Sequence, residues 1–302
     1  MEKEISLKAK ISKDIIRFFT SQNLIGSQIA DGTFRKKMQK IEPPWLCPLD
    51  YHNTKIQMKR FRMEFLLPKE NVGRYVILQL HGGGYQCPLR NAYRDFAVKY
   101  SQICNNASVL SIDYRVAPEN PFPAALEDAY TAYEWLLHLG YSSEQIILVG
   151  DSAGGGLALA LLHYLKDREE VLPGKYVGMS PWTDLTASGS SYQENYEKDP
   201  LFGGTKESMI YSNAYYGKHD PSHPYISPKF GEFQGLPPML LQVGEDEMLL
   251  SDSVDVAEKA KEAGCQVKLT IYPGMYHVFQ LGLDHMKESA EAWKEIETFL
   301  EE

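Results

Sequence analysis

Residues 146–156 read Ile-Ile-Leu-Val-Gly-Asp-Ser-Ala-Gly-Gly-Gly, and Leu157 to Leu165 continue with the composition of a helix. This pattern predicts a nucleophile elbow, in which Ser152 occupies a strained strand-to-helix turn with its hydroxyl exposed. Gly150 and Gly154 stand at the two positions where a side chain would collide with the turn. The helix that follows directs free backbone N–H groups toward any anion that forms at the serine.

A second motif, His81-Gly-Gly-Gly84, follows directly on the apolar run Tyr75–Leu80. Three glycines at a strand end leave the backbone free to turn its N–H groups outward, which predicts an oxyanion hole. Preorganised donors of this kind contribute ~3–4 kcal/mol each in other enzymes. A phosphate cradle is the alternative, but no Lys-Ser/Thr pair follows and no helix opens immediately.

A serine nucleophile needs a base, and the base needs an orienting carboxylate. His277 is the candidate base, because it follows the last apolar run in a Pro/Gly turn and precedes the final helix. The acid is expected after the run Met239–Val243, where Glu245, Asp246 and Glu247 are neighbours and leave the choice open. The chain order of nucleophile, acid and histidine is the α/β-hydrolase order.

The remaining histidines are interpreted as packing or surface residues. His219 and His223 have a spacing compatible with a metal pair, but they lie in a proline-rich loop without a third ligand, so no metal is predicted. The others are His52, His138, His163 and His285.

Composition limits the class of protein. A chain of 302 residues with 43% hydrophobic content suits one α/β domain with an elaboration. The net charge of −9 argues against a nucleic-acid or anionic-membrane partner. Four widely spaced cysteines are expected to be reduced, and the mixed charges of residues 1–10, together with the lack of a long apolar stretch, predict a cytoplasmic protein.

The order of elements predicts an eight-stranded, mainly parallel sheet with helices on both faces. Residues 56–67 alternate as an antiparallel strand with one buried face. Six further runs are apolar throughout, as strands covered on both faces are: 75–80, 108–112, 146–149, 176–179, 239–243 and 267–271. Helical patterns cover 91–104, 123–139, 155–166, 251–263 and 284–302.

Two stretches break this alternation and are expected to form a cap. One is residues 1–45, with a helical apolar stripe from Ile11 to Phe19, and the other is the long interval 182–238, with a helical piece at 206–216. The domain prediction assigns 1–45 and 182–217 to the cap and 46–181 and 218–302 to the α/β-hydrolase core. A cap would cover the carboxyl ends of the strands, where ligands bind. The N-terminal helix could instead shield a sheet edge.

From about residue 75 to the end, the chain resembles the hormone-sensitive-lipase-like (bacterial family IV) esterases of the α/β-hydrolase fold. The motifs that carry the resemblance are His-Gly-Gly-Gly at 81–84, Asp-Tyr-Arg-Val-Ala-Pro-Glu at 113–119, Pro-Ala-Ala at 123–125, Gly-Asp-Ser-Ala-Gly-Gly at 150–155, Ser-Pro-Trp at 180–182 and Pro-Gly-Met-Tyr-His-Val-Phe at 273–279. The resemblance implies a lid built from the N-terminal segment and the insertion. It also implies oxyanion donors at Gly83, Gly84 and Ala153.

The acid motif departs from the family pattern. Where the family usually has Asp-Pro-Leu, this chain has Glu247-Met-Leu, so alignment assigns the acid to Glu247 with Asp246 as second choice. In the family's second motif, Arg115, Glu119 and Asp128 are interpreted as structural residues whose pairing holds a loop.

Together these features predict a cofactor-free serine esterase that hydrolyses short-chain esters, acetyl to roughly hexanoyl, through an acyl-enzyme. The choice of short acyl groups rests on the family resemblance. An amidase, peptidase or acyl-transferase would share Ser152, Glu247 and His277, whereas a silent binding protein on this fold would be expected to lose the histidine. The strand 267–272 is expected at the sheet edge, where related esterases dimerise, which predicts a homodimer.

Overall fold

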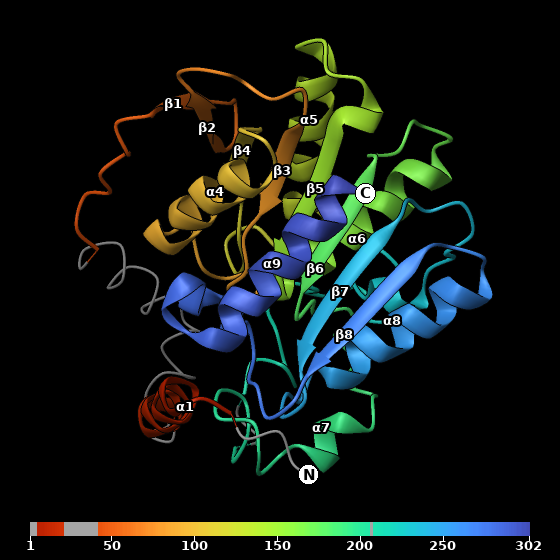
Figure 1. Cartoon of the computed structure of the whole chain (residues 1–302). Coiled ribbons are helices and arrows are strands. Elements are labelled where there is room, and N and C mark those ends of the chain that lie inside the picture. The colour runs from red at the N-terminus through yellow and green to blue at the C-terminus, as the bar shows by residue number, and fades with distance from the viewer. Residues whose placement is uncertain (1–4, 21–41, 206–207) are drawn as a thin grey trace.

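The computed structural model describes residues 5–20, 42–205 and 208–302. One sheet of eight strands crosses the molecule in the order β1-β2-β4-β3-β5-β6-β7-β8, and β2 runs antiparallel to both of its neighbours while all later pairs are parallel (Figure 1). The strands are β1 Tyr51–Gln57, β2 Arg62–Pro68, β3 Val76–Leu80, β4 Ser108–Asp113, β5 Ile146–Asp151, β6 Lys175–Met179, β7 Met239–Gly244 and β8 Val267–Tyr272. The predicted fold class, a mainly parallel eight-stranded sheet, is confirmed.

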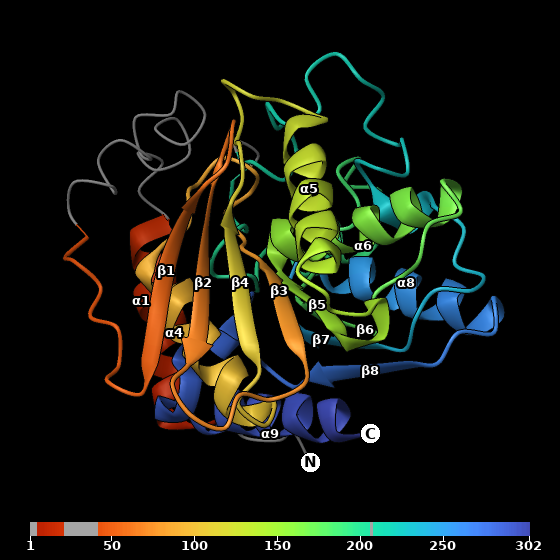
Figure 2. The same cartoon turned by 90° about the horizontal axis from the view of Figure 1, so that it is seen from above.

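Helices cover both faces of this sheet (Figure 2). The bounds on one face are α5 Ala124–His138, α6 Ser152–Asp167 and α8 Leu250–Glu262, and those on the other are α4 Asn91–Ile103 and α9 Lys287–Glu301. Strands β3 to β7 are almost entirely buried because side chains from both layers pack on them. Strand β8 is half exposed and lies at the edge, as the sequence predicted.

Two sequence predictions about local structure are wrong. Residues 56–67 do not form one strand, because the charged turn at 58–61 divides them between the antiparallel partners β1 and β2. Of the helical piece expected at 206–216, residues 208–216 form consecutive turns. Asn213 Oδ1 accepts from the Tyr215 N–H within this segment, and Asn213 Nδ2 donates to Gly84 O. These contacts hold the segment against the core in a non-helical conformation.

The two stretches expected to form the cap meet beyond the carboxyl ends of β7 and β8. The predicted N-terminal helix is present as α1 Leu7–Thr20, and residues 21–41 of the expected segment lie outside the described residues. The interval after β6 carries the short helix α7 Ser191–Glu194 (Figure 1). The Arg17 guanidinium donates to Lys198 O at 3.1 Å, and Thr20 Oγ1 donates to Pro200 O at 2.6 Å, so α1 contacts the interval directly.

Candidate active site

Ser152 lies where β5 ends and α6 begins, with a left-handed backbone at φ +50°. The two flanking glycines are required by close backbone approach. A Cβ atom at Gly150 would lie 2.4 Å from the carbonyl oxygen of Gly154, and one at Gly154 would lie 2.1 Å from that of Leu80. This is the strained strand-to-helix turn that the sequence predicts, and it presents the serine hydroxyl at the carboxyl edge of the sheet.

Three side chains that are far apart in the sequence form one chain of hydrogen bonds. Ser152 Oγ lies 2.8 Å from His277 Nε2, and His277 Nδ1 lies 2.9 Å from Glu247 Oε2. A carboxylate only accepts, so Nδ1 carries the imidazole proton and Nε2 is left to accept from the serine. The solvent-exposed fractions are small, at 8% for Ser152, 6% for His277 and 0% for Glu247.

The two candidate acids point in different directions. The second oxygen of Glu247 accepts from Ser180 Oγ at 2.7 Å and from the Gly244 N–H at 2.5 Å, so with His277 three donors surround its fully buried carboxylate. Asp246 instead pairs with Lys13 of α1. The geometry therefore favours Glu247 as the partner of the histidine.

Ser180 belongs to the Ser-Pro-Trp motif, from which no role for its side chain is predicted. Its hydroxyl donates to Glu247 and accepts from the Val278 N–H at 3.1 Å, and it thereby joins the acid to the residue after His277. Its φ of +46° is unusual for a residue other than glycine. The position directly after strand β6, at the same sheet edge as Ser152, is the signal that could have identified it.

The glycine turn lies beside this chain of hydrogen bonds. Gly83 has φ +110° and Gly84 has φ +62°, values that a side chain rarely allows. The turn is fixed through its other polar groups, because Gly83 O accepts from the Gln86 and Cys87 N–H groups at 3.1 Å. Ala153 lies in the first turn of α6, where the side chain of Asp151, the residue before the helix, makes no capping hydrogen bond.

Asp151 ties the glycine turn to the nucleophile turn. Its carboxylate accepts from the Gly82 N–H at 3.0 Å and from the Tyr93 hydroxyl at 3.1 Å. Burial raises the pKa of Asp151 to about 7, and these two donors oppose the shift. His81 is fully buried and stacks on Tyr114 with 4.2 Å between ring centroids, and burial lowers its pKa, which favours the neutral imidazole.

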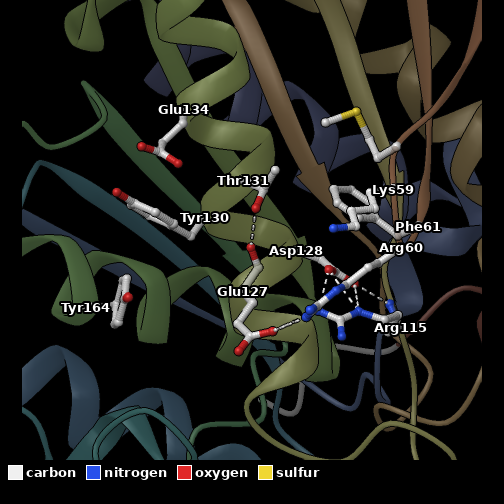
Figure 3. Close-up of a pocket in the computed structure, with 11 residues that line it drawn as sticks. Lys59, Arg60, Phe61, Arg115, Glu127, Asp128, Tyr130, Thr131, Glu134 and Tyr164 are labelled. Carbon is white, nitrogen blue, oxygen red and sulfur yellow. Dashed lines mark hydrogen bonds and ion pairs between the residues drawn. The ribbon is translucent and has the colours of Figure 1, made fainter.

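A cavity of about 450 Å³ lies away from this site, between the β1–β2 turn and α5 (Figure 3). Arg115 stands at its wall, donates to both carboxylate oxygens of Asp128 and also pairs with Glu127. The predicted pairing of Arg115 with Asp128 is therefore present, and it ties the segment after β4 to α5. Ser152, Glu247 and His277 do not line this cavity.

The other expectations concern metals and membranes. Within the described ranges, no group of three histidine, cysteine or acidic side chains is arranged to hold a metal ion. His219 and His223 both pack their rings against Phe122. None of the helices in the described part of the chain has the length and apolar character needed to cross a membrane.

Comparison with known proteins relates this geometry to proteins of known activity. Residues 77–281 match the protein family described as alpha/beta hydrolase fold. An acetyl-hydrolase of Streptomyces hygroscopicus is 38% identical over 216 residues, which are 72% of this chain and 71% of that protein. An esterase of Acinetobacter venetianus is 33% identical over 260 residues, 84% of this chain and 85% of that protein.

A solved structure extends the likeness to three dimensions. The crystal structure of an esterase from the bacterial hormone-sensitive lipase family superposes with a TM-score of 0.80 at 33% identity. The match covers 92% of this chain and 96% of that chain. The similarity in structure thus extends beyond residues 77–281 of the family match.

Proposed function

The chain belongs to the hormone-sensitive-lipase-like (bacterial family IV) esterases of the α/β-hydrolase fold and is a carboxylic ester hydrolase, and on this premise we propose that Ser152, His277 and Glu247 form its catalytic triad. The observation that carries the proposal is the unbroken series of hydrogen bonds from Ser152 Oγ through the imidazole to Glu247. Each group in it has the donor or acceptor role that nucleophilic catalysis requires.

In the proposed reaction, Ser152 Oγ attacks the ester carbonyl carbon as its proton passes to His277 Nε2. Glu247 holds the imidazole through Nδ1 and stabilises the imidazolium that forms. The carbonyl oxygen becomes an oxyanion, which accepts from the N–H groups of Gly83, Gly84 and Ala153. The imidazolium then protonates the departing alcohol, and an acyl-serine remains. Water attacks the acyl-serine as its proton passes to His277, and the imidazolium then returns this proton to Ser152 Oγ as the carboxylic acid leaves.

We further propose short acyl groups, from acetyl to roughly hexanoyl, as the substrates. The ring of Phe202 lies 4.8 Å from that of His277, and a Cβ atom on Gly84 would meet the sulfur of Met209 at 2.4 Å. Side chains therefore crowd both the base and the oxyanion turn. The similarity to an acetyl-hydrolase supports the same substrate class. A series of p-nitrophenyl esters from acetate to palmitate measures the limit, and a maximum at palmitate would contradict the proposal.

A fluorophosphonate probe tests the nucleophile directly. The probe forms a covalent bond to an activated serine, so mass spectrometry of the labelled protein is expected to locate the adduct on Ser152. Labelling elsewhere, or equal labelling of the Ser152→Ala variant, would show that another residue is the nucleophile. A pre-steady-state burst of p-nitrophenol with p-nitrophenyl acetate is the expected kinetic sign of the acyl-enzyme.

Two finer proposals concern assembly and location. In the described part of the chain, strand β8 pairs with β7 on one side only, and its Lys268 and Thr270 both bond to Glu295 of α9. We propose that a second copy pairs antiparallel with the backbone of its other side. Light scattering tests the homodimer, for which the expected mass is about twice 34.3 kDa. A cytoplasmic location is the second proposal, and fractionation of the source cells tests it.

A further inference from the structure

Three polar side chains of the interval after β6 stand four residues apart: Ser191, Asn195 and Asp199. The Asn195 N–H donates to Ser191 O at 3.0 Å, and the Asp199 N–H donates to Asn195 O at 2.9 Å. These are helical i to i−4 bonds, so the three side chains lie on one face. Their exposed fractions are 2%, 3% and 3%, and we refer to them as the polar ladder.

The polar ladder bonds to the backbone of the turn that carries the acid. Asn195 Nδ2 donates to the carbonyl oxygens of Glu245 and Glu247, both at 2.8 Å. Asp199 Oδ2 accepts from the Met248 N–H at 2.8 Å, and Ser191 Oγ donates to Met248 O at 2.7 Å. The backbone of the acid is thus fixed on both sides of Glu247 by side chains from outside the sheet.

Asp199 of the polar ladder is also connected to His277, through Phe202. Asp199 Oδ1 accepts from the N–H groups of Leu201 at 2.8 Å and Phe202 at 3.0 Å. These bonds fix the loop that places the Phe202 ring against His277. Burial raises the pKa of Asp199, and the N–H donors of Met248 and Phe202 oppose this. One carboxylate therefore connects the turn of the acid with the aromatic contact of the base.

We propose that Asn195 and Asp199 are positioning residues for the reaction, which act by holding Glu247 within hydrogen-bond distance of His277 Nδ1. The inference rests on the proposed triad. A carboxylate that drifts by an ångström loses its hold on the imidazole, and misplacement of this size costs on the order of 10²-fold in rate. Because neither residue touches the ester, the loss is confined to kcat and leaves KM unchanged.

Asp199→Asn is the decisive substitution. A carboxylate accepts at both oxygens, whereas an amide must present its NH₂ either to the Met248 N–H or to the N–H groups of Leu201 and Phe202. We expect a fall in kcat of about 10- to 100-fold with p-nitrophenyl acetate. Asn195→Ala removes the two donors without adding a repulsion, and it serves as the second variant if Asp199→Asn does not fold. Its expected loss is smaller and again confined to kcat.

A double-mutant cycle with Glu247→Gln separates positioning from general destabilisation. If Asp199 acts through Glu247, adding Asp199→Asn to Glu247→Gln changes kcat by less than about twofold. The same factor in both backgrounds, or no loss in the wild-type background, overturns the proposal. If the proposed triad itself is wrong, the result is different, because the Glu247→Gln variant alone would then retain nearly full activity.

Asp184→Asn is the matched control. Asp184 is a fully buried aspartate of the same interval, and it bonds to Lys229 and to the N–H groups of Thr186 and Ser188 rather than to the turn of the acid. We expect this variant to lower the melting temperature while kcat stays near the wild-type value. A loss of kcat equal to that of Asp199→Asn would mean that loosening the interval anywhere has the same effect, and the proposal would be wrong.

Discussion

The turn of Ser152 and the turn of Glu247 lie at the two ends of one hydrogen-bond series, but the molecule builds them by different means. Residues 150–154 are held by strand pairing on both sides of β5 and by backbone contacts too close for any Cβ atom. Residues 244–248 also follow a buried strand, yet their geometry depends on side chains from the interval after β6 and from α1.

This difference distinguishes two ways of placing the side chains of the proposed triad. The conformation of the turn at Ser152 is fixed by close backbone contacts, and the glycines that allow these contacts are neighbours of the serine in the sequence. The acid turn is selected by hydrogen bonds from residues about 50 positions away in the chain. The first arrangement is insensitive to the segments around it, whereas the second changes when those segments change.

The largest expected effect is at the nucleophile turn itself. Ser152→Ala removes one oxygen and leaves the glycine contacts in place, so we expect turnover to fall by ~10⁶-fold, as loss of a triad nucleophile does in serine hydrolases. The melting temperature should stay within a few degrees of wild type. Steady-state assays with p-nitrophenyl acetate measure the loss, and a residual rate above 1% of wild type would contradict the assignment.

At the acid turn, Glu247→Gln and Asp246→Asn form a matched pair of neighbours. The first removes the acceptor for His277 Nδ1–H, and we expect kcat to fall by about 10⁴-fold because the imidazole takes the wrong tautomer. The second weakens only the pair with Lys13 and should retain most of the activity. Equal losses in the two variants would show that the acid turn works through its overall charge rather than through one carboxylate.

Ser180→Ala tests whether the acid depends on donors outside its own turn. It removes a hydrogen bond to a buried carboxylate and leaves the Val278 N–H without its acceptor, which costs roughly 1.5–3 kcal/mol. We expect kcat to fall by about 10- to 100-fold. Ser101→Ala on α4 is the control, since it also removes a fully buried serine hydroxyl but should leave kcat unchanged.

The smallest expected effect on activity comes from Asp151→Asn, and its readout is stability against pH. Burial raises the pKa of Asp151 from 3.8 to about 7, so the folded protein holds a proton that the unfolded chain releases near pH 4. The stability from this proton is present in acid and is lost as the pH rises toward 7, by roughly 4 kcal/mol at most.

The amide does not titrate, so the melting temperature of wild type should fall relative to Asp151→Asn between pH 5 and pH 8. Calorimetry at intervals of one pH unit measures the difference. A difference that stays constant across this range would mean that Asp151 does not gain a proton on folding.

Most of the sheet could be predicted because buried parallel strands are apolar on both faces, and the runs at 76–80 and 239–244 have almost no polar side chains. The hairpin at 51–68 could not be predicted from the sequence. Apolar and polar residues alternate from one of its strands into the next, and only the charged turn at 58–61 separates the two strands. The segment 208–216 has helical composition, but it forms turns, and Asn213 within it bonds to Gly84 O of the glycine turn.

The same distinction applies to the site. That Ser152 and His277 lie at the ends of strands could be predicted, because motifs of adjacent residues encode their turns. The choice between Glu247 and Asp246 followed from alignment alone, since two neighbouring carboxylates differ only in which way the turn points them. The contacts of Ser180, Asn195 and Asp199 with the turn of Glu247 could not be predicted, because these partners are far apart in the sequence and meet only in the folded chain.

The hydrogen bonds between the polar ladder and residues 245–248 limit how this enzyme can be redesigned. Exchanging all of the predicted cap insertion, residues 182–217, for that of another esterase in order to change substrate scope would also remove the hydrogen bonds that Asn195 and Asp199 form with residues 245–248. A graft that begins after Phe202 keeps those bonds and still replaces Met209 and Asn213 at the glycine turn. The segment that can be exchanged without loss of these bonds therefore begins after Phe202 and not at the end of strand β6.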